Sequence, residues 1–248
     1  MNSHVYDLLV IGAGPAGAST AFWAARAGLD VALVEKKSFP REKTCGDGLT
    51  PRAVHQLEEM ELISALGPFH RFEGLRTIAH GRMLQMSWPT HPVYPKYGLV
   101  IRRCDLDDLV AKHAVAAGTT LIESTEALYP IEGNETRLKG AVIGHTGSRD
   151  ERKPESTILA DYVVVADGAN SRFGRALGTS RNRSHPMGMA IRTYYESSAH
   201  DDPWIESVLD VRDRAGNAMP GYGWIFPVGD GTINVGICLL YTSDAADE

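Results

Sequence analysis

The stretch 7–35 constrains the fold of this chain more than any other, because it reads as strand, glycine-rich turn, helix and strand in succession. The continuous apolar run over 8–11 is typical of a parallel strand that is buried on both faces. The alanine-rich segment 16–27 predicts a helix, and the apolar run 31–34 predicts a second strand. We therefore expect a βαβ unit and an α/β fold.

The turn between the first strand and the helix predicts a phosphate-binding site. Gly12, Gly14 and Gly17 permit a tight turn, close approach of a diphosphate and close packing of the helix, whose N-terminus offers free N–H donors. Glu35 follows at the distance of the acid that binds ribose hydroxyls, and it would repel the 2′-phosphate of NADP. The alternative is an ordinary glycine turn in a βαβ crossover. The residues expected to hold an adenine dinucleotide here are Gly12, Ala13, Gly14, Pro15, Ala16, Gly17, Glu35 and Lys36.

The rest of the chain predicts two interleaved domains. Prolines and glycines over 36–49 indicate a long ordered turn, and two strands around Gly81 interrupt the α/β pattern. A helix over 101–118 and further strands restore that pattern, before strands dominate again from residue 187. We expect the dinucleotide domain to comprise 1–74 and 99–186, and a mainly antiparallel substrate domain to comprise 75–98 and 187–237.

Asp167 and Gly168 follow the expected strand 161–166 at its carboxyl end, where open parallel sheets bind ligands. Gly168 would allow a ligand to approach the backbone closely, and Arg172 or Arg175 would offset phosphate charge.

Composition excludes several classes of function. The net charge of -6, with dispersed Lys and Arg, provides no basic surface for nucleic acid. Cys45, Cys104 and Cys238 are too few and too scattered for a disulfide framework or a zinc site, and the histidines show no metal-ligand spacing. The first strand begins within a few residues of Met1, and no apolar run approaches the ~18 residues of a spanning helix. We therefore expect a cytoplasmic location.

Four further segments carry a resemblance to a known family. FPREKTCGDGLTPRAV follows Glu35, Arg103 begins an R-x-x-L-D helix, VADGANSRFGRALG follows the third buried strand, and PGYGWIFPVGDG contains a Y-x-W-x-F-P motif. Together with GAGPAG, these segments resemble the FAD-dependent geranylgeranyl reductase family, within the flavoproteins similar to p-hydroxybenzoate hydroxylase. The closest branch looks like the menaquinone side-chain reductases, which saturate one isoprene double bond of the quinone tail.

The resemblance implies a Rossmann-like FAD-binding domain of the glutathione-reductase and p-hydroxybenzoate-hydroxylase type, interleaved with an antiparallel substrate domain. It implies that the glycine turn and Glu35 hold the ADP half of FAD. The motif positions that it assigns to the rest of the cofactor are Cys45, Gly46, Asp47, Arg103, Asp167 and Gly168. Those that it assigns to the substrate are Tyr222, Trp224, Phe226 and Pro227.

Several of these residues also have an ordinary structural interpretation. Tyr222, Trp224 and Phe226 alternate and so share one face of a strand, as a wall for an isoprenoid chain or as simple sheet core. Cys45 is the candidate catalytic residue, as a proton donor or flavin contact, or else a small buried filler. Asp47 binds flavin or caps its own turn, and Arg103 is a cofactor ligand or a solvated helix charge.

The function that we expect is reduction of isoprenoid C=C bonds by a FAD-dependent oxidoreductase. An aromatic hydroxylase on the same fold and a prenyl-binding module without redox chemistry are the alternatives. No second glycine fingerprint is present, so the electrons are expected from an external donor, either NAD(P)H or a redox protein. Prenyl lipids reside in bilayers, and we therefore expect peripheral contact with the inner face of the cell membrane.

The last residues, CLLYTSDAADE over 238–248, resemble a translated sequencing adapter. The family continues with a further FAD segment that this sequence lacks. We therefore expect a non-native tail on a truncated reading frame, with an authentic short acidic tail as the alternative.

Overall fold

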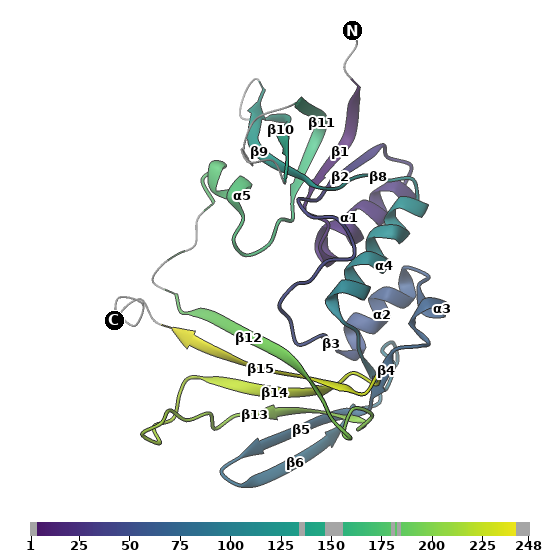
Figure 1. The fold of residues 1–248 in the computed structure, drawn as a ribbon. Coiled ribbons are helices and arrows are strands. Elements are labelled where there is room, and N and C mark those ends of the chain that lie inside the picture. Colours follow the sequence, from purple (N-terminus) through teal and green to yellow (C-terminus); the bar gives the residue numbers. More distant parts are fainter. Residues whose placement is uncertain (1–3, 134–136, 147–155, 180–181, 183–184, 242–248) are drawn as a thin grey trace. The chain divides into compact units, whose positions relative to one another are not determined.

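The computed structural model describes residues 4–133, 137–146, 156–179, 182 and 185–241, and the chain divides into two compact units (Figure 1). Unit 1 comprises 1–42 and 104–181, and unit 2 comprises 43–103 and 182–248. Each unit contains its own six-stranded sheet. The expected combination of a Rossmann-like α/β domain with an interleaved sheet domain is confirmed.

Unit 1 is organised around β1, which lies between β2 and β11 and is parallel to both, so that Val10 pairs with Leu33 and with Val164. The sheet order is β8-β2-β1-β11-β10-β9, and β10 is the strand that pairs antiparallel, with β11 on one side and β9 on the other. A strand in the middle of a sheet needs an apolar sequence without interruption, as β1 has. The elements are β1 (Val5–Ile11), α1 (Pro15–Arg26), β2 (Val31–Val34), α4 (Arg103–Ala116), β8 (Thr120–Ile122), β9 (Thr125–Glu132), β10 (Leu138–His145), β11 (Ser156–Val165) and α5 (Arg172–Ala176).

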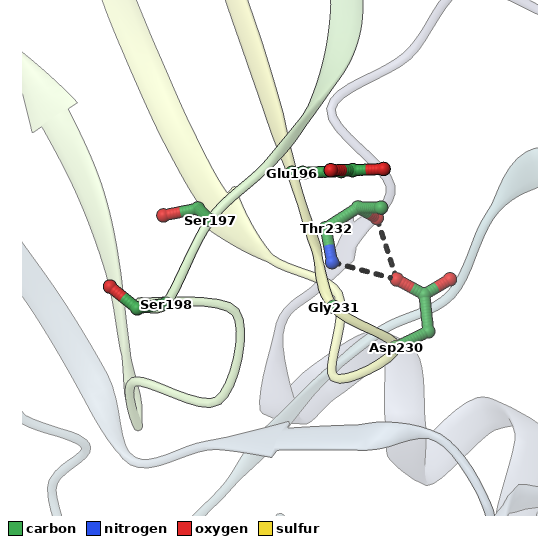
Figure 2. Close-up of a pocket in the computed structure, with 6 residues that line it drawn as sticks. All are labelled: Glu196, Ser197, Ser198, Asp230, Gly231 and Thr232. Carbon is green, nitrogen blue, oxygen red and sulfur yellow. Dashed lines mark hydrogen bonds between the residues drawn. The ribbon is translucent and has the colours of Figure 1, made fainter.

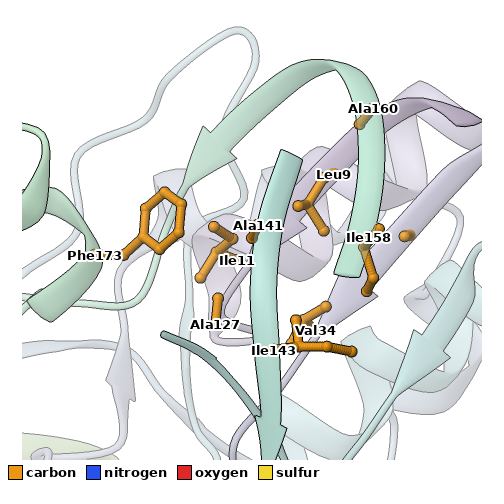
Figure 3. Packing of buried hydrophobic residues seen from close by; sticks show 10 residues of the cluster. Leu9, Ile11, Val34, Ala127, Ala141, Ile143, Ile158, Ala160 and Phe173 are labelled. Carbon is orange, nitrogen blue, oxygen red and sulfur yellow. The ribbon is translucent and has the colours of Figure 1, made fainter. Parts of the chain in front are cut away.

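The core of unit 1 packs side chains from strands that are distant in sequence (Figure 3). Phe173 of α5 is fully buried with Leu9 of β1 and the neighbouring aliphatic residues. Alanines at 127, 141 and 160 leave the space that these larger side chains fill, as close packing requires. This core fixes β1 and β2, and therefore the turn between β1 and α1.

Unit 2 contains a six-stranded sheet in the order β12-β15-β14-β13-β5-β6 and a three-stranded sheet in the order β3-β7-β4. All neighbours in the larger sheet are antiparallel except β5 and β13, which are parallel. The elements are β3 (Gly48–Leu49), α2 (Pro51–Glu59), α3 (Ile63–Leu66), β4 (His70–Phe72), β5 (Gly74–Ala79), β6 (Arg82–Ser87), β7 (Gly98–Val100), β12 (Met187–Glu196), β13 (Trp204–Val208), β14 (Gly221–Pro227) and β15 (Thr232–Tyr241).

The compact units divide the chain at different positions from the expected domain boundaries. Residues 43–74 and 99–103 lie in unit 2, although the sequence grouped them with the dinucleotide domain. The reason is pairing, because β3 and β4 both pair with β7 and form a small sheet of their own. The expected turn over 36–49 thus ends in a short strand.

Two further findings concern the ends of elements. The last described strand, β15, extends through Tyr241 and pairs with both β12 and β14, so the first residues of the expected tail 238–248 lie within a strand. Residues 242–248 lie outside the described residues. Among the described residues, no helix is both long enough and apolar enough to span a bilayer.

Candidate functional site

The turn between β1 and α1 contains two glycines that the protein itself requires. Gly12 has φ +93°, and a Cβ there would lie 2.6 Å from the carbonyl oxygen of Ala166. A Cβ on Gly17 would lie 1.8 Å from the carbonyl oxygen of Gly12. Both positions therefore exclude any side chain, because β11 and the turn approach them too closely.

Gly14 differs, because neither its backbone nor its surroundings explain the glycine. Its φ of −72° is open to any residue. The nearest atom to a Cβ built there is Nη2 of Arg41, at 3.9 Å. The first intrahelical bond runs from Ala18 to the carbonyl of Gly14, so the N–H groups of Ala16 and Gly17 have no intrahelical acceptor. Open space in front of a helix N-terminus fits a diphosphate.

Glu35 lies at the end of β2 and faces this turn. Its Oε2 accepts the N–H of Ala13 at 3.0 Å and its Oε1 accepts the N–H of Lys37 at 3.1 Å. The carboxylate is buried and therefore fixed beside the turn, where the ribose-binding acid was expected. Lys36 is exposed, and its carbonyl accepts the hydroxyl of Thr146.

Arg41 is the residue at this turn that the sequence interpretation missed. Its Nη1 lies 2.8 Å from Oδ2 of Asp107 and its Nη2 lies 3.4 Å from Oε2 of Glu35. The side chain is only 9 % exposed, and its Nε is buried without a hydrogen-bond partner among the described residues. A buried guanidinium next to Gly14 suits the charge of a diphosphate. The available signal was a basic residue in the loop that directly follows the ribose-binding acid.

Asp167 and Gly168 lie on the other side of the same turn. A Cβ on Gly12 would be 2.7 Å from Cα of Asp167, and Oδ1 of Asp167 is buried with no hydrogen-bond partner among the described residues. A buried acceptor of this kind fits a hydroxyl donor of a bound ligand. Gly168 has φ +91° with open space at its Cβ position.

Arg172 and Arg175, the two arginines expected near phosphate, make other contacts. Arg172 reaches Glu126 at 3.5 Å, and Arg175 donates to the carbonyl of Asn170 at 3.4 Å. Taken together, the open glycine, the buried guanidinium and the unsatisfied acceptor fit the phosphate and sugar groups of an adenine dinucleotide.

In unit 2, the turn over 45–48 is fixed by Asp47, which is 1 % exposed and has φ +67°. Its Oδ1 accepts the backbone N–H of Arg103 at 3.2 Å, and its Oδ2 accepts the hydroxyl of Tyr194 and Nδ2 of Asn234. Burial raises the pKa of the Asp47 carboxyl, against the opposing effect of these hydrogen bonds and of Arg192. Both oxygens are used inside the protein, which favours the turn-holding role of Asp47 over flavin binding.

Asn234 of β15 connects the turn to the aromatic strand β14. It is fully buried, its Nδ2 donates to Asp47 at 2.7 Å and to the carbonyl of Cys45 at 3.1 Å, and its Oδ1 accepts the indole N–H of Trp224 at 2.9 Å. The sequence interpretation missed this residue. The signal was a single amide within an otherwise apolar strand, on the face opposite to Ile233 and Val235.

Arg103 is buried at the start of α4, and its backbone N–H is bound by Asp47. The alternative of a solvated helix charge is therefore wrong for this residue. Its expected role as a cofactor ligand stays a prediction.

A cavity of about 290 Å³ lies against the turn, entirely within unit 2. Tyr222, Trp224 and Phe226 all line it, with ring centroids 6.0 and 6.4 Å apart along the strand. Pro227 is buried at the end of β14 and is not among the lining residues. The lining is Cys45, Gly46, Asp47, Gly48, Thr50, Phe72, Ile205, Tyr222, Trp224 and Phe226.

The glycines of the turn are explained by one of these aromatic rings. A Cβ on Gly46 would lie 2.8 Å from Cε2 of Phe226, and one on Gly48 would lie 3.0 Å from the same atom. The ring of Phe226 therefore lies against the backbone of this turn, where a side chain at position 46 or 48 would meet it. Cys45 is half-buried at the cavity, so its thiol borders the space that a substrate would occupy.

Tyr222 is the most exposed of the three aromatic residues. Burial nevertheless raises the pKa of its hydroxyl, and the nearby thiols of Cys238 and Cys45 act in the same direction. A tyrosine hydroxyl with its ordinary pKa of about 10 is protonated at neutral pH with or without this shift, so it can donate a hydrogen bond.

A second hollow in unit 2, of about 580 Å³, is open and polar (Figure 2). Asp230 there accepts both the N–H and the hydroxyl of Thr232, at 3.1 and 2.6 Å, and it pairs with Arg102 at 2.6 Å. The other lining residues are Glu196, Ser197, Ser198 and Gly231. Its acidic groups do not suit a phosphate, and none of the residues expected from the sequence lies in it.

The chain is similar to flavoproteins over nearly its whole length. Residues 5–230 match the family model described as FAD binding domain. The menaquinone reductase of Mycobacterium tuberculosis (strain ATCC 25618 / H37Rv) is 40% identical over 244 residues, which cover 96% of this chain and 56% of that protein. The digeranylgeranylglycerophospholipid reductase of Methanosarcina acetivorans is 30% identical, and the match covers 95% of this chain and 55% of that protein.

Among solved structures, a geranylgeranyl bacteriochlorophyll reductase-like protein from Thermoplasma acidophilum superposes with a TM-score of 0.79 at 27% identity. The match covers 99% of this chain and 58% of that structure. The chain thus spans about half the length of the curated relatives that it matches.

Proposed function

The chain belongs to the FAD binding domain family, and on this premise we propose that the protein containing it reduces isoprenoid carbon–carbon double bonds, with the prenyl side chain of menaquinone as substrate. The resemblance to the geranylgeranyl reductases is confirmed by the relatives. The observation that carries the proposal is the cavity against the turn 45–48, because its walls are aromatic and aliphatic.

The residues that would hold FAD are those that fit its phosphates and sugars. The N–H groups at the start of α1 and the guanidinium of Arg41 would bind the diphosphate. Glu35 and the free Oδ1 of Asp167 would accept hydroxyl groups. FAD, when bound, supplies the reducing electrons, and the protein contributes orientation and exclusion of water.

The chemistry of the cavity favours a hydrocarbon substrate over an anionic aromatic one. Asp47 is the only charged residue in the lining, and its carboxylate is bound by Arg103, Tyr194 and Asn234. No lining residue would pair with a substrate carboxylate. Rings of Trp224 and Phe226 offer apolar surface on which a prenyl chain packs well.

Reduction of an isolated alkene needs a hydride at one carbon and a proton at the other. Three of the lining residues, Cys45, Thr50 and Tyr222, carry a thiol or hydroxyl group. A thiol and a phenol are stronger acids than an aliphatic hydroxyl, which leaves Cys45 and Tyr222 as candidates. The hydroxyl of Tyr222 is protonated at neutral pH, and burial, which raises its pKa, makes it a weaker acid than an exposed tyrosine. We assign the proton donor to this pair, with Cys45 as the candidate catalytic residue.

The test uses the full-length protein loaded with FAD. Under anaerobic conditions with chemically reduced flavin, we expect menaquinone to gain two hydrogens in its side chain. Mass spectrometry of the lipid after extraction and re-oxidation in air measures this gain, because air returns any menaquinol to the quinone but leaves a saturated side chain unchanged. Protein without flavin is the control. An unchanged menaquinone mass, together with substrate-stimulated oxygen consumption in air, would contradict the proposal and favour hydroxylation.

Electrons are proposed to come from outside the chain, from NAD(P)H or a redox protein. Stopped-flow absorbance of the bound flavin distinguishes the two, because only a direct nicotinamide donor bleaches it without a second protein. We also propose peripheral contact with the membrane, since the substrate resides there. Co-sedimentation with vesicles tests this, and full retention in the supernatant would contradict it.

A further inference from the structure

One face of the large sheet of unit 2 carries an apolar row from the cavity to the outer strand. The register pairs Ile205 of β13 with Leu75 of β5, and Leu75 with Met86 of β6. The pairing of Glu206 with Ile225 places Ile205 opposite Phe226 of β14. Residues paired across neighbouring strands lie on the same face, so these four side chains form one continuous row.

The row begins in the cavity and becomes more exposed outward. Phe226 and Ile205 line the cavity. Leu75 packs against a small core of buried residues that consists of Phe72, Val100 and Ile205. Met86, at the outer strand, is 44% exposed. Leu84 lies two residues earlier on the same face of β6 and is 59% exposed. The inner end is therefore core, and the outer end is uncovered hydrocarbon surface.

On the opposite face of the same strands, the row directly behind this one is polar. The corresponding row there contains Glu206, Arg76 and Gln85, which follow each other across β13, β5 and β6. Nη1 of Arg76 lies 2.6 Å from Glu206, and its Nε donates to Gln85 at 3.3 Å. The next row on that face, Val208, Ile78 and Met83, is apolar. The feature peculiar to the cavity face is therefore that its apolar row starts from residues that line the cavity.

The size of the cavity explains why this surface matters. At about 290 Å³, it lies at the lower limit of the roughly 300–1,000 Å³ that sites for drug-sized ligands occupy. A lipid with several isoprene units does not fit inside such a space. The remaining tail must lie against some other surface, and the row leading away from the cavity is the apolar surface continuous with it.

We propose that the row Phe226, Ile205, Leu75 and Met86, with Leu84 beside its outer end, binds the part of the prenyl tail that extends beyond the cavity. This inference rests on the proposed function, because it takes a polyisoprenoid as the ligand. The row would bind hydrocarbon without contacting the reacting double bond. It therefore determines how strongly tail length affects binding, and not the rate of the reduction itself.

The test compares two matched positions on β6 in the full-length, FAD-loaded protein. Leu84→Glu changes the cavity face, and Met83→Glu changes the opposite face at nearly the same exposure, 59% against 61%. We expect Leu84→Glu, and Met86→Glu as a second variant, to raise the KM for a long-tailed menaquinone about tenfold. The KM for a short-tailed analogue and all kcat values should stay unchanged, and Met83→Glu should match the parent throughout.

Equilibrium binding, measured by quenching of tryptophan fluorescence, separates this inference from the proposed function. Suppose that the parent protein reduces neither substrate, but Leu84→Glu still weakens the binding of the long-tailed menaquinone and not of the short-tailed analogue. The reductase proposal is then contradicted, and the proposed binding of the tail by the row is supported. If all variants bind and reduce both tails like the parent, the row is overturned and the reductase proposal stands. The row is also overturned if Leu84→Glu abolishes dimer formation or vesicle binding and tail length has no effect in any variant.

Discussion

At the scale of single residues, the three glycines of the first turn have separable roles. Gly17 is required by packing, since a Cβ would lie 1.8 Å from a backbone oxygen, whereas Gly14 faces open space. We expect Gly17→Ala to lower the free energy of unfolding by about 3 kcal/mol or more. Gly14→Ala should cost no more than about 1 kcal/mol, which is the scale of a helix N-cap change.

The affinity for FAD should depend on Gly14, although the stability of the protein depends little on it. Gly14→Ala is expected to weaken flavin binding at least about tenfold, because its methyl group occupies the space proposed for the diphosphate. Urea unfolding of the flavin-free protein and quenching of flavin fluorescence measure the two quantities. Flavin binding of Gly14→Ala equal to that of the parent would contradict the assignment of this turn to the cofactor.

A second residue-scale prediction concerns Cys104. Burial raises the pKa of its thiol to about 11, and the carboxylates of Asp105 and Glu42 contribute in the same direction. At pH 9 little thiolate is present, so iodoacetamide should alkylate Cys104 about tenfold more slowly in the folded protein than in urea. The difference between the alkylation rates of the folded and the unfolded protein should disappear as the pH approaches 11. Mass spectrometry of the peptide follows the reaction, and equal rates at pH 9 would contradict the prediction.

At the scale of elements, Asn234 joins the turn 45–48 to β14 through β15. Asn234→Ala would leave the carbonyl of Cys45 and the indole N–H of Trp224 without the partner that Asn234 provides, and it would remove one of the three hydrogen bonds to Asp47. We expect a loss of about 3 kcal/mol in stability. Asn217→Ala is the control, because its amide bonds only to exposed Asp213, and it should cost about 0.5 kcal/mol. Thermal unfolding measures both, and equal losses would contradict the buried network.

Some of the helices, strands and contacts could be predicted from the sequence, and others could not. β1, α1 and β2 were predictable because their signals are local: a buried run, three glycines and an alanine-rich helix. Asp47 could be placed in a turn, but its partners Tyr194 and Asn234 lie more than a hundred residues away. β3 has two residues and no periodicity, so its pairing with β7 was not visible. Arg41 could not be assigned to the phosphate site from the sequence, because only the structure shows that its guanidinium lies beside Gly14.

At the scale of the whole molecule, the residues proposed to bind the ADP half of FAD all belong to unit 1. ADP alone should therefore protect β1, α1 and β2 from hydrogen exchange. At a hundredfold excess over its Kd, the stabilisation of this unit should be about 2.7 kcal/mol. Strands β12 to β15 of unit 2 provide the internal control. Equal protection of both units, or none in β1, would contradict the division of roles.

The parallel pairing of β5 with β13 has a consequence for how this protein is made. β6 ends at Ser87 and β13 begins at Trp204, so the ribosome releases the hairpin of β5 and β6 long before its neighbour exists. At translation rates of about 5–20 residues per second, that interval lasts on the order of ten seconds. Throughout it, the open edge of β5 and the side chain of Leu75 remain without their native cover. The nascent chain therefore presents a natural target for chaperones until residue 208 has emerged.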